Sequence, residues 1–158
     1  CETVAGAGTG TFEFEAASGV YNELQAGSYV FMDADYARNL NADGSFYEQF
    51  QHSLLVLATV LSLPSTDRVV VDAGLKSHSV DSGLPRVFGA DDVDYVSASD
   101  EHGVLDLGHS NRRYSLGEVI KLIPGHCDPT VNLHDWYVGI RNDRVECLWP
   151  VAARGPGI

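Results

Sequence analysis

The sequence has little positive charge and little cysteine, and it lacks a long hydrophobic run. Its 158 residues include 10 lysine and arginine residues against 22 aspartate and glutamate residues, which gives a formal net charge of −12. Because the few basic residues form no cluster, we expect no nucleic-acid partner. The longest apolar candidate, residues 54–63, is shorter than the roughly 20 residues of a membrane helix and is interrupted by Thr59 and Ser62. The composition therefore predicts a soluble domain with no membrane partner.

The three cysteines form an odd set. Cys1, Cys127 and Cys147 show no repeated spacing, which argues against a disulfide framework and favours a reducing, cytoplasmic compartment. With 44% hydrophobic residues, the chain is long enough to bury one substantial core. It begins with cysteine in place of methionine and continues at once into a glycine-rich segment. We therefore expect a portion of a longer protein.

The distribution of apolar residues predicts a short α/β segment followed by a β-domain. A glycine-rich loop at residues 5–11 precedes an amphipathic stretch that runs to Leu24, and an apolar run follows at residues 30–32, in the order loop, helix, strand. Later in the chain, β-branched runs alternate with Gly, Pro, Asp and Ser turns, which is typical of all-β structure. These runs lie at residues 69–71, 86–88 and 119–123. Residues 46–60 fit either a helix or a buried strand, and we favour the strand.

Residues 124–129 combine turn residues with side chains that bind metals. Two prolines and a glycine argue against a regular helix here. In an extended backbone, His126 and Asp128 project to one side and Cys127 to the other. Imidazole and carboxylate form a mixed nitrogen and oxygen pair that suits zinc, manganese or cobalt. The pair needs further ligands from water, substrate or another segment, and the same residues can equally cap a surface turn.

Two small loops near the N-terminus have the composition of phosphate sites. The first comprises Gly8, Thr9, Gly10 and Thr11, and the second Gly27, Ser28 and Tyr29. Closely spaced glycines let backbone amides approach an anion. Two such loops bracketing one helix match the phosphate site after strands seven and eight of a β/α barrel. Because the first loop lacks the lysine of a nucleotide-binding loop, a plain glycine-rich turn remains an alternative, as does ordinary core packing for the tyrosine.

Five segments together resemble the metal-activated, pyridoxal-phosphate-dependent D-threonine aldolases. They are Gly-Thr-Gly-Thr at 8–11 and the segments 23–33, 71–76, 100–103 and 124–132. These enzymes share the alanine-racemase fold with D-serine dehydratases, in which a β/α barrel holds the cofactor and a C-terminal β-domain follows. The resemblance implies a mainly β chain from the C-terminal portion of such an enzyme. Residues 1–37 would contain the last α/β unit of the (β/α)8 barrel, and residues 38–158 the D-serine dehydratase-like β-domain.

The resemblance also implies a set of site residues. The phosphate of pyridoxal phosphate would bind at Gly8, Thr9, Gly10, Thr11, Gly27, Ser28 and Tyr29. Gln25 would face the pyridine ring, at the place where alanine racemases have arginine. His126 and Asp128 would hold a divalent manganese, zinc, cobalt or magnesium ion. The related dehydratases have cysteine two residues after this histidine, so a carboxylate at that position favours a harder ion and the aldolase.

The implied activity is retro-aldol cleavage of D-threonine and related D-3-hydroxy-amino acids to glycine and an aldehyde. A bound metal would lower the pKa of the substrate hydroxyl, and the cofactor would accept the electrons left on Cα. Lys76 and Lys121 lie in segments that do not match the Schiff-base lysine, so we assign no catalytic residue and expect an inactive isolated chain. The alternatives are a D-serine or 3-hydroxyaspartate dehydratase and a non-catalytic metal-binding β-domain. Fold analogy suggests a homodimer.

Other titratable residues receive structural interpretations. His102 is expected in a turn, although it could approach the site from a partner subunit. His134 and Asp135 read as a turn or as a hydrogen-bonding pair behind the ligands. The acidic residues at 91–94 lack the glycine and distal glutamate of a calcium-binding loop, so we expect a solvated loop. Purely structural roles are expected for His52, His78 and His109.

Overall fold

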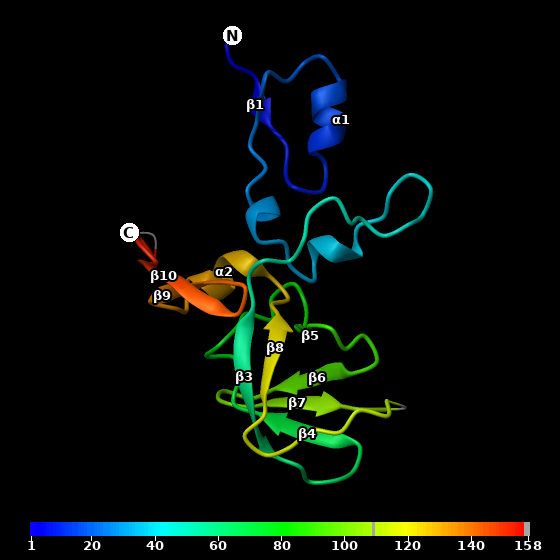
Figure 1. Ribbon diagram of the computed structural model, residues 1–158. Helices are drawn as coiled ribbons and strands as arrows, with labels where there is room; N and C mark the ends of the chain where they lie inside the picture. The colour runs from blue at the N-terminus through cyan, green and yellow to red at the C-terminus, as the bar shows by residue number, and fades with distance from the viewer. Residues whose placement is uncertain (109, 157–158) are drawn as a thin grey trace.

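The structure, a computed structural model, describes residues 1–108 and 110–156. His109, with its expected structural role, lies outside the described residues. Figure 1 shows a small α/β segment at the N-terminal end, a curled β-sheet at the other end, and helix α2 (Cys127–Val131) between them. The residues of the candidate site lie where these parts meet.

The N-terminal segment is a β-α-β unit. Strands β1 (Ala5–Gly6) and β2 (Glu23–Leu24) pair in parallel and are joined by helix α1 (Phe12–Ala17). A helical crossover between parallel neighbours is the repeating unit of β/α barrels. The predicted helix is therefore present, but it is shorter than expected, because Leu24 belongs to the second strand.

The apolar run at residues 30–32 is not a strand, contrary to the sequence prediction. The 3-10 helix η1 (Ser28–Val30) contains its start, and the Ser28 carbonyl oxygen accepts hydrogen bonds from the amides of Phe31 and Met32. The amides of the run donate to carbonyl oxygens three or four residues earlier, as in a helical turn, rather than to a neighbouring strand. A second 3-10 helix, η2 (Tyr36–Arg38), follows.

The β-domain is built on one six-stranded antiparallel sheet with the order β5-β8-β3-β4-β7-β6. Its strands are β3 (Val56–Ser62), β4 (Arg68–Val71), β5 (Arg86–Val87), β6 (Asp94–Ala98), β7 (Gly103–Asp106) and β8 (Val119–Ile123). The edge strands β5 and β6 approach each other, so the sheet curls toward a barrel. The strand favoured for residues 46–60 occupies only the end of that stretch, since β3 begins at Val56.

Alternate side chains of the sheet form the hydrophobic core. Val69 and Val71 of β4 are buried, as are Leu105 of β7 and Ile120 and Leu122 of β8. Each such side chain contributes about 1.5–3 kcal/mol when it is removed from water. The β-branched runs predicted as strands thus supply the inward face of the sheet, which confirms the mainly β prediction for this part of the chain.

Helix α2 shows that the prediction of no helix at residues 124–129 is wrong. The helix begins at Cys127, and Pro129 is its third residue. The first four amides of a helix have no acceptor within it, so a proline there removes no hydrogen bond. His126 precedes the helix with an extended backbone (φ −142°, ψ 123°). The turn residues therefore shape the start of a helix rather than exclude one.

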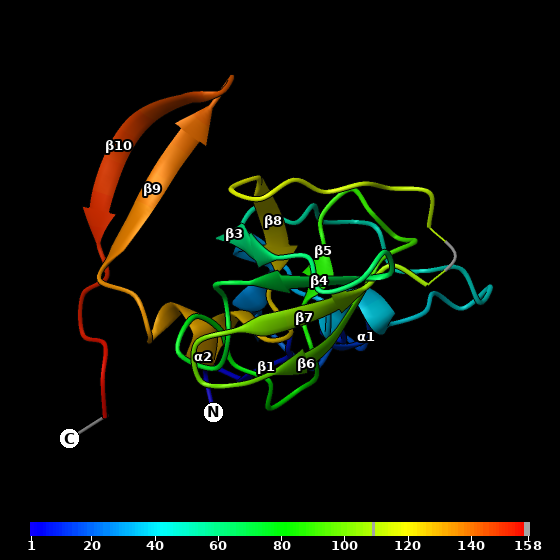
Figure 2. The ribbon, with the colours of Figure 1, turned by 90° about the horizontal axis from the view of Figure 1, so that it is seen from below.

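After α2 the chain forms a hairpin of β9 (Trp136–Arg141) and β10 (Arg144–Pro150), which projects from the sheet (Figure 2). Its Tyr137 ring packs against Phe31 of the N-terminal segment, with 5.6 Å between ring centroids. Within residues 1–108 and 110–156, no helix has the length and apolar character needed to cross a membrane.

Candidate metal and cofactor site

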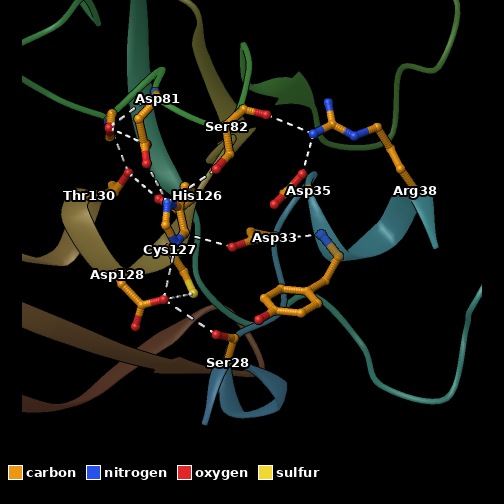
Figure 3. A network of polar contacts seen from close by, with 12 residues as sticks. Ser28, Asp33, Asp35, Arg38, Asp81, Ser82, His126, Cys127, Asp128 and Thr130 are labelled. Carbon is orange, nitrogen blue, oxygen red and sulfur yellow. Dashed lines mark hydrogen bonds and ion pairs between the residues drawn. The ribbon is translucent and has the colours of Figure 1, made fainter. Parts of the chain in front are cut away.

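The close approach of two loops brings the candidate site together. Strand β8 ends at Ile123, and Gly125 then passes directly over Gly83. An ideal Cβ on Gly125 would lie 2.0 Å from the Gly83 carbonyl oxygen, so only glycine allows this contact. The contact places residues 81–82 beside His126 at the start of α2 (Figure 3).

His126 and Asp128 lie together at the first turn of α2. The His126 Nε2 atom is 3.3 Å from Asp128 Oδ2, and Asp128 is the more exposed of the two side chains. A cation bound at about 2.1 Å from each atom, with a bond angle between about 90° and 110°, would hold them about 3.0–3.4 Å apart. The observed spacing therefore fits a shared divalent cation. The helix start, not an extended chain, brings them to one side.

Two protein ligands leave room for others. Within the residues that the structure describes, no group of three or more histidine, cysteine, aspartate and glutamate side chains has the geometry of a metal site. A cation held by His126 and Asp128 would therefore need further ligands from water or substrate.

Cys127 lies between the two candidate ligands but is not suited to metal binding. The side chain is buried, and burial, with the charges of Asp33 and Asp128, raises the pKa of its thiol to about 12. Metals bind the thiolate form, so a metal would have to displace this proton before it could bind the sulfur. Its Sγ atom instead donates to Asp128 Oδ2 at 3.8 Å. The carboxylate is thus the better partner for His126.

Asp33, which the sequence analysis did not single out, fixes the start of α2. Its Oδ2 accepts the Cys127 amide at 2.8 Å, its Oδ1 accepts the Tyr36 amide at 2.9 Å, and the residue is fully buried. The amides of Ala34 and Asp35 donate to the carbonyl oxygens at residues 124 and 125. An aspartate whose carboxylate accepts the amide three residues later is a common turn signal. The hydrogen bond from the Cys127 amide of α2 joins residues 94 positions apart, so no pattern of neighbouring residues predicts it.

Asp81 is the second residue that sequence reasoning missed. Its Oδ2 lies 2.7 Å from His126 Nδ1, and Ser82 Oγ lies at 3.4 Å from the same nitrogen. Burial lowers the pKa of His126, but the hydrogen bond and charge of Asp81, with the charge of Asp128, raise the pKa by more. The pKa of Asp81 is lowered by the hydrogen bond from Ser79 and then by His126.

The two predicted phosphate loops follow adjacent parallel strands. Residues 7–11 come after β1 and residues 25–29 after β2, so both loops lie at the carboxyl ends of their strands, where barrel enzymes bind phosphate. The Tyr29 amide donates to the buried Thr9 Oγ1 at 3.0 Å and ties the loops together. Among the described contacts of residues 8–11 and 27–29, four amides donate to no protein acceptor, and these belong to Thr9, Gly10, Gly27 and Ser28. Thr9 is buried, so the amides of Gly10, Gly27 and Ser28 are the ones open to a ligand. These free donors fit a phosphate group.

The remaining residues of the two loops have different surroundings. Thr11 Oγ1 accepts the Gly8 amide at 3.2 Å, which closes the first loop on itself. The Tyr29 ring is 43% exposed and lies 5.3 Å from Phe50, so it is not a core residue. Gln25 is exposed, and its amide donates to the Gly6 carbonyl oxygen. Its side chain is therefore accessible to a ligand.

Ser28 joins the predicted phosphate site to the predicted metal site. Its Oγ donates to Asp128 Oδ2 at 3.3 Å, across 100 residues of sequence (Figure 3). Pyridoxal phosphate bound by these loops would therefore lie close to a cation on Asp128. The fold thus brings together two features that the sequence presents separately.

The other singled-out residues fit their structural interpretations. His102 is exposed in a turn, where its carbonyl oxygen accepts the Ser99 amide. His134 Nε2 lies 2.8 Å from the Ser77 carbonyl oxygen, and Asp135 pairs with Arg154. In the acidic loop, exposed ion pairs join Asp91 to Arg86 and Asp92 to Arg112. His52 contacts the Asp33 carbonyl oxygen, and His78 contacts the Tyr95 hydroxyl.

Comparison with known proteins identifies aldolases as relatives. A 3-hydroxy-D-aspartate aldolase from Paracoccus denitrificans is 53% identical over 158 residues, which are 99% of this chain and 40% of that protein. The crystal structure of D-threonine aldolase from Filomicrobium marinum matches with a TM-score of 0.89 and 49% identity, over 98% of this chain and 41% of that chain. The chain therefore spans about 40% of the length of these relatives.

A more distant match concerns the fold alone. An alanine racemase-like protein from Idiomarina loihiensis matches with a TM-score of 0.69 and 22% identity, over 87% of this chain and 40% of that chain. Together with the aldolase structure, it confirms the expected mainly β fold of the alanine-racemase type. The family model described as "putative serine dehydratase domain" matches residues 53–140. The chain belongs to the putative serine dehydratase domain family.

Proposed function

We propose that this chain supplies the metal-binding and phosphate-binding residues of a pyridoxal-phosphate-dependent lyase. The enzyme would cleave D-threonine and related D-3-hydroxy-amino acids to glycine and an aldehyde. The hydrogen bond from Ser28 to Asp128 carries the proposal, because it joins a loop suited to phosphate with a carboxylate suited to a metal. The aldolase names of the relatives support the same reaction class.

Each part of the site would have its own task. His126 Nε2 and Asp128 Oδ2 would hold a divalent manganese, zinc, cobalt or magnesium ion. The free amides of Gly10, Gly27 and Ser28 would bind the cofactor phosphate. When bound, the cation makes a substrate hydroxyl easier to deprotonate, and pyridoxal phosphate stabilises the electrons left on Cα.

The Schiff-base lysine is proposed to lie outside this chain. Lys76 forms an exposed ion pair with Glu101, and Lys121 is exposed on β8. Neither takes part in the contacts that unite the two loops with α2. We accordingly expect no activity from these 158 residues alone.

Cleavage to an aldehyde is favoured over dehydration. The atom that faces His126 is a carboxylate oxygen, whereas the dehydratase-like arrangement described above would have sulfur two residues after the histidine. The adjacent Cys127 is buried, and its Sγ donates to Asp128 Oδ2 rather than lying free for a cation. An oxygen ligand favours harder cations such as manganese or magnesium.

Product analysis of the full-length protein tests the proposal. With pyridoxal phosphate, Mn²⁺ and D-threonine, we expect glycine and acetaldehyde in equal amounts, and loss of both products with a chelator or with Asp128→Ala. Cys127→Ala is the matched control and should keep the activity. Formation of 2-oxobutanoate and ammonia would instead identify a dehydratase. Metal binding without any product would identify a non-catalytic metal-binding domain, and either result contradicts the proposal.

Three further features stay predictions. Gln25 would face the pyridine ring, so Gln25→Arg should change the ratio of aldol cleavage to racemisation of D-threonine. We propose a homodimer for the full-length protein, which light scattering would measure directly. A cytoplasmic location is proposed from the cysteine content, and fractionation of the source cells would test it.

A further inference from the structure

Asp81 lies on the side of His126 opposite to Asp128. Its Oδ2 is 2.7 Å from Nδ1, while Nε2 of the same ring is 3.3 Å from Asp128 Oδ2. The residue belongs to the loop between β4 and β5, 45 residues before His126. Figure 3 shows this carboxylate and Asp128 approaching the imidazole from different segments. The ring is thus held between two carboxylates.

The hydrogen bond to Asp81 fixes which ring nitrogen carries the proton. A neutral imidazole has one N–H, and a carboxylate at 2.7 Å from Nδ1 holds that proton on Nδ1. Nε2 then presents its lone pair toward Asp128 Oδ2. A lone pair on Nε2 and a carboxylate oxygen at 3.3 Å repel each other unless a proton or a metal cation lies between them. Histidine ligands of metals characteristically donate their second nitrogen to such a partner.

We propose that Asp81 is a positioning residue that prepares His126 Nε2 to bind the catalytic metal. This inference rests on the metal site of the proposed function. Asp81 would not touch the metal itself. It would keep the imidazole in the Nδ1–H tautomer, fix the ring orientation and increase the basicity of Nε2.

The position of Asp81 is itself fixed by a chain of hydrogen bonds. Ser79 Oγ donates to Asp81 Oδ1 at 2.6 Å, and the Ser79 amide donates to Thr130 Oγ1 at 3.1 Å. Thr130 Oγ1 in turn donates to the His126 carbonyl oxygen at 2.7 Å. These contacts connect the loop that carries Asp81 to Thr130 of α2 and to His126 just before it. The carboxylate is therefore held against the histidine rather than left free on the surface.

The alternative partner of Nδ1 is weaker. Ser82 Oγ lies 3.4 Å from Nδ1, against 2.7 Å for Asp81 Oδ2. A hydrogen bond weakens with length, and an ionised acceptor makes it about twice as strong as a neutral one. Asp81 is therefore the residue that determines the tautomer.

Manganese binding to the full-length protein tests this role. Free Mn²⁺ would be measured by electron paramagnetic resonance at one mildly alkaline pH, without substrate. Asp81→Ala should weaken Mn²⁺ binding about 10- to 100-fold. Asp81→Asn keeps an acceptor oxygen for Nδ1–H and should show a smaller loss. Asp91→Asn is the matched control, because it also removes an exposed carboxylate from an ion pair, and it should bind Mn²⁺ as the wild type does.

Nitrogen NMR of His126 supplies a readout that a general loss of structure would not produce. In the metal-free wild type we expect the Nδ1–H tautomer, and in Asp81→Ala a mixture with the Nε2–H tautomer. Unchanged Mn²⁺ affinity and an unchanged tautomer in Asp81→Ala would overturn the inference. If His126→Ala also left Mn²⁺ binding unchanged, the metal site of the proposed function would fail as well. If His126→Ala lost Mn²⁺ binding while Asp81→Ala kept it, only the role of Asp81 would be contradicted.

Discussion

Replacing Gly125 by alanine tests how closely the two loops of the site must approach. An ideal Cβ on Gly125 would lie 2.0 Å from the Gly83 carbonyl oxygen and 2.8 Å from its carbonyl carbon. A close carbon–oxygen contact is about 3.3 Å, so the loops would have to separate by about 1.3 Å. Asp81 and Ser82 would move away from His126 with the loop that carries Gly83.

The magnitude of the effect follows from that displacement. The 2.7 Å contact between Asp81 and His126 would lengthen to about 4 Å, beyond the range of a hydrogen bond. Overpacking a close contact costs about 1–3 kcal/mol of the free energy of unfolding. Loss of the partner on Nδ1 should weaken Mn²⁺ binding about 10-fold or more.

Urea unfolding and Mn²⁺ titration of the full-length protein would measure both quantities. Gly103→Ala is the matched control, since its Cβ would lie 2.3 Å from the Tyr95 hydroxyl oxygen in the sheet. It should reduce stability but leave the Mn²⁺ affinity within about two-fold, because its clash does not involve His126. If Gly125→Ala bound Mn²⁺ as tightly as the wild type, the reasoning about the close approach would be refuted.

Three further substitutions test separate parts of the account. Asp33→Asn keeps one acceptor oxygen for two amides, so it should lower the free energy of unfolding by about 1–3 kcal/mol. Cys127→Ala should leave Mn²⁺ affinity unchanged, and the thiol should resist alkylating reagents, because its pKa is raised to about 12. Burial lowers the pKa of His78 below 6.5, so the unfolded chain takes up a proton that the folded chain excludes. The free energy of unfolding should therefore decrease as pH falls below 6.5, and His78→Gln should remove this part of the pH dependence.

Each of these predictions has a result that contradicts it. For Asp33→Asn, the control is Asp35→Asn, since Asp35 forms an exposed ion pair. If both changes lowered the free energy of unfolding equally, the role of the buried carboxylate would be disproved. Loss of Mn²⁺ binding in Cys127→Ala would show that sulfur is a ligand. Identical pH dependence of wild type and His78→Gln, measured by urea unfolding, would show that this histidine titrates equally in both states.

Local patterns predicted the features that depend on neighbouring residues. The β-branched runs at residues 69–71 and 119–123 became strands β4 and β8 because their alternate side chains face the core. The apolar run at residues 30–32 has a similar composition but hydrogen-bonds to Ser28 and forms a turn. Composition alone does not distinguish these cases, because the outcome depends on whether a neighbouring strand is available.

The candidate site was predicted only in part for a related reason. His126 and Asp128 were visible as a pair because only one residue separates them along the chain. Asp33 and Asp81 act on this segment from 94 and 45 residues away. Their roles depend on the packing of α2 against two other loops. The spacing of residues along the chain does not predict this packing. The contact between Ser28 and Asp128 also required the folded chain.

Anomalous diffraction from crystals of the full-length protein, grown with Mn²⁺ and pyridoxal phosphate, would test the central claim most directly. The account predicts one manganese peak within about 2.3 Å of both His126 Nε2 and Asp128 Oδ2, with the cofactor phosphate on the amides of Gly10, Gly27 and Ser28. A manganese peak elsewhere, or none at these two side chains, would contradict it.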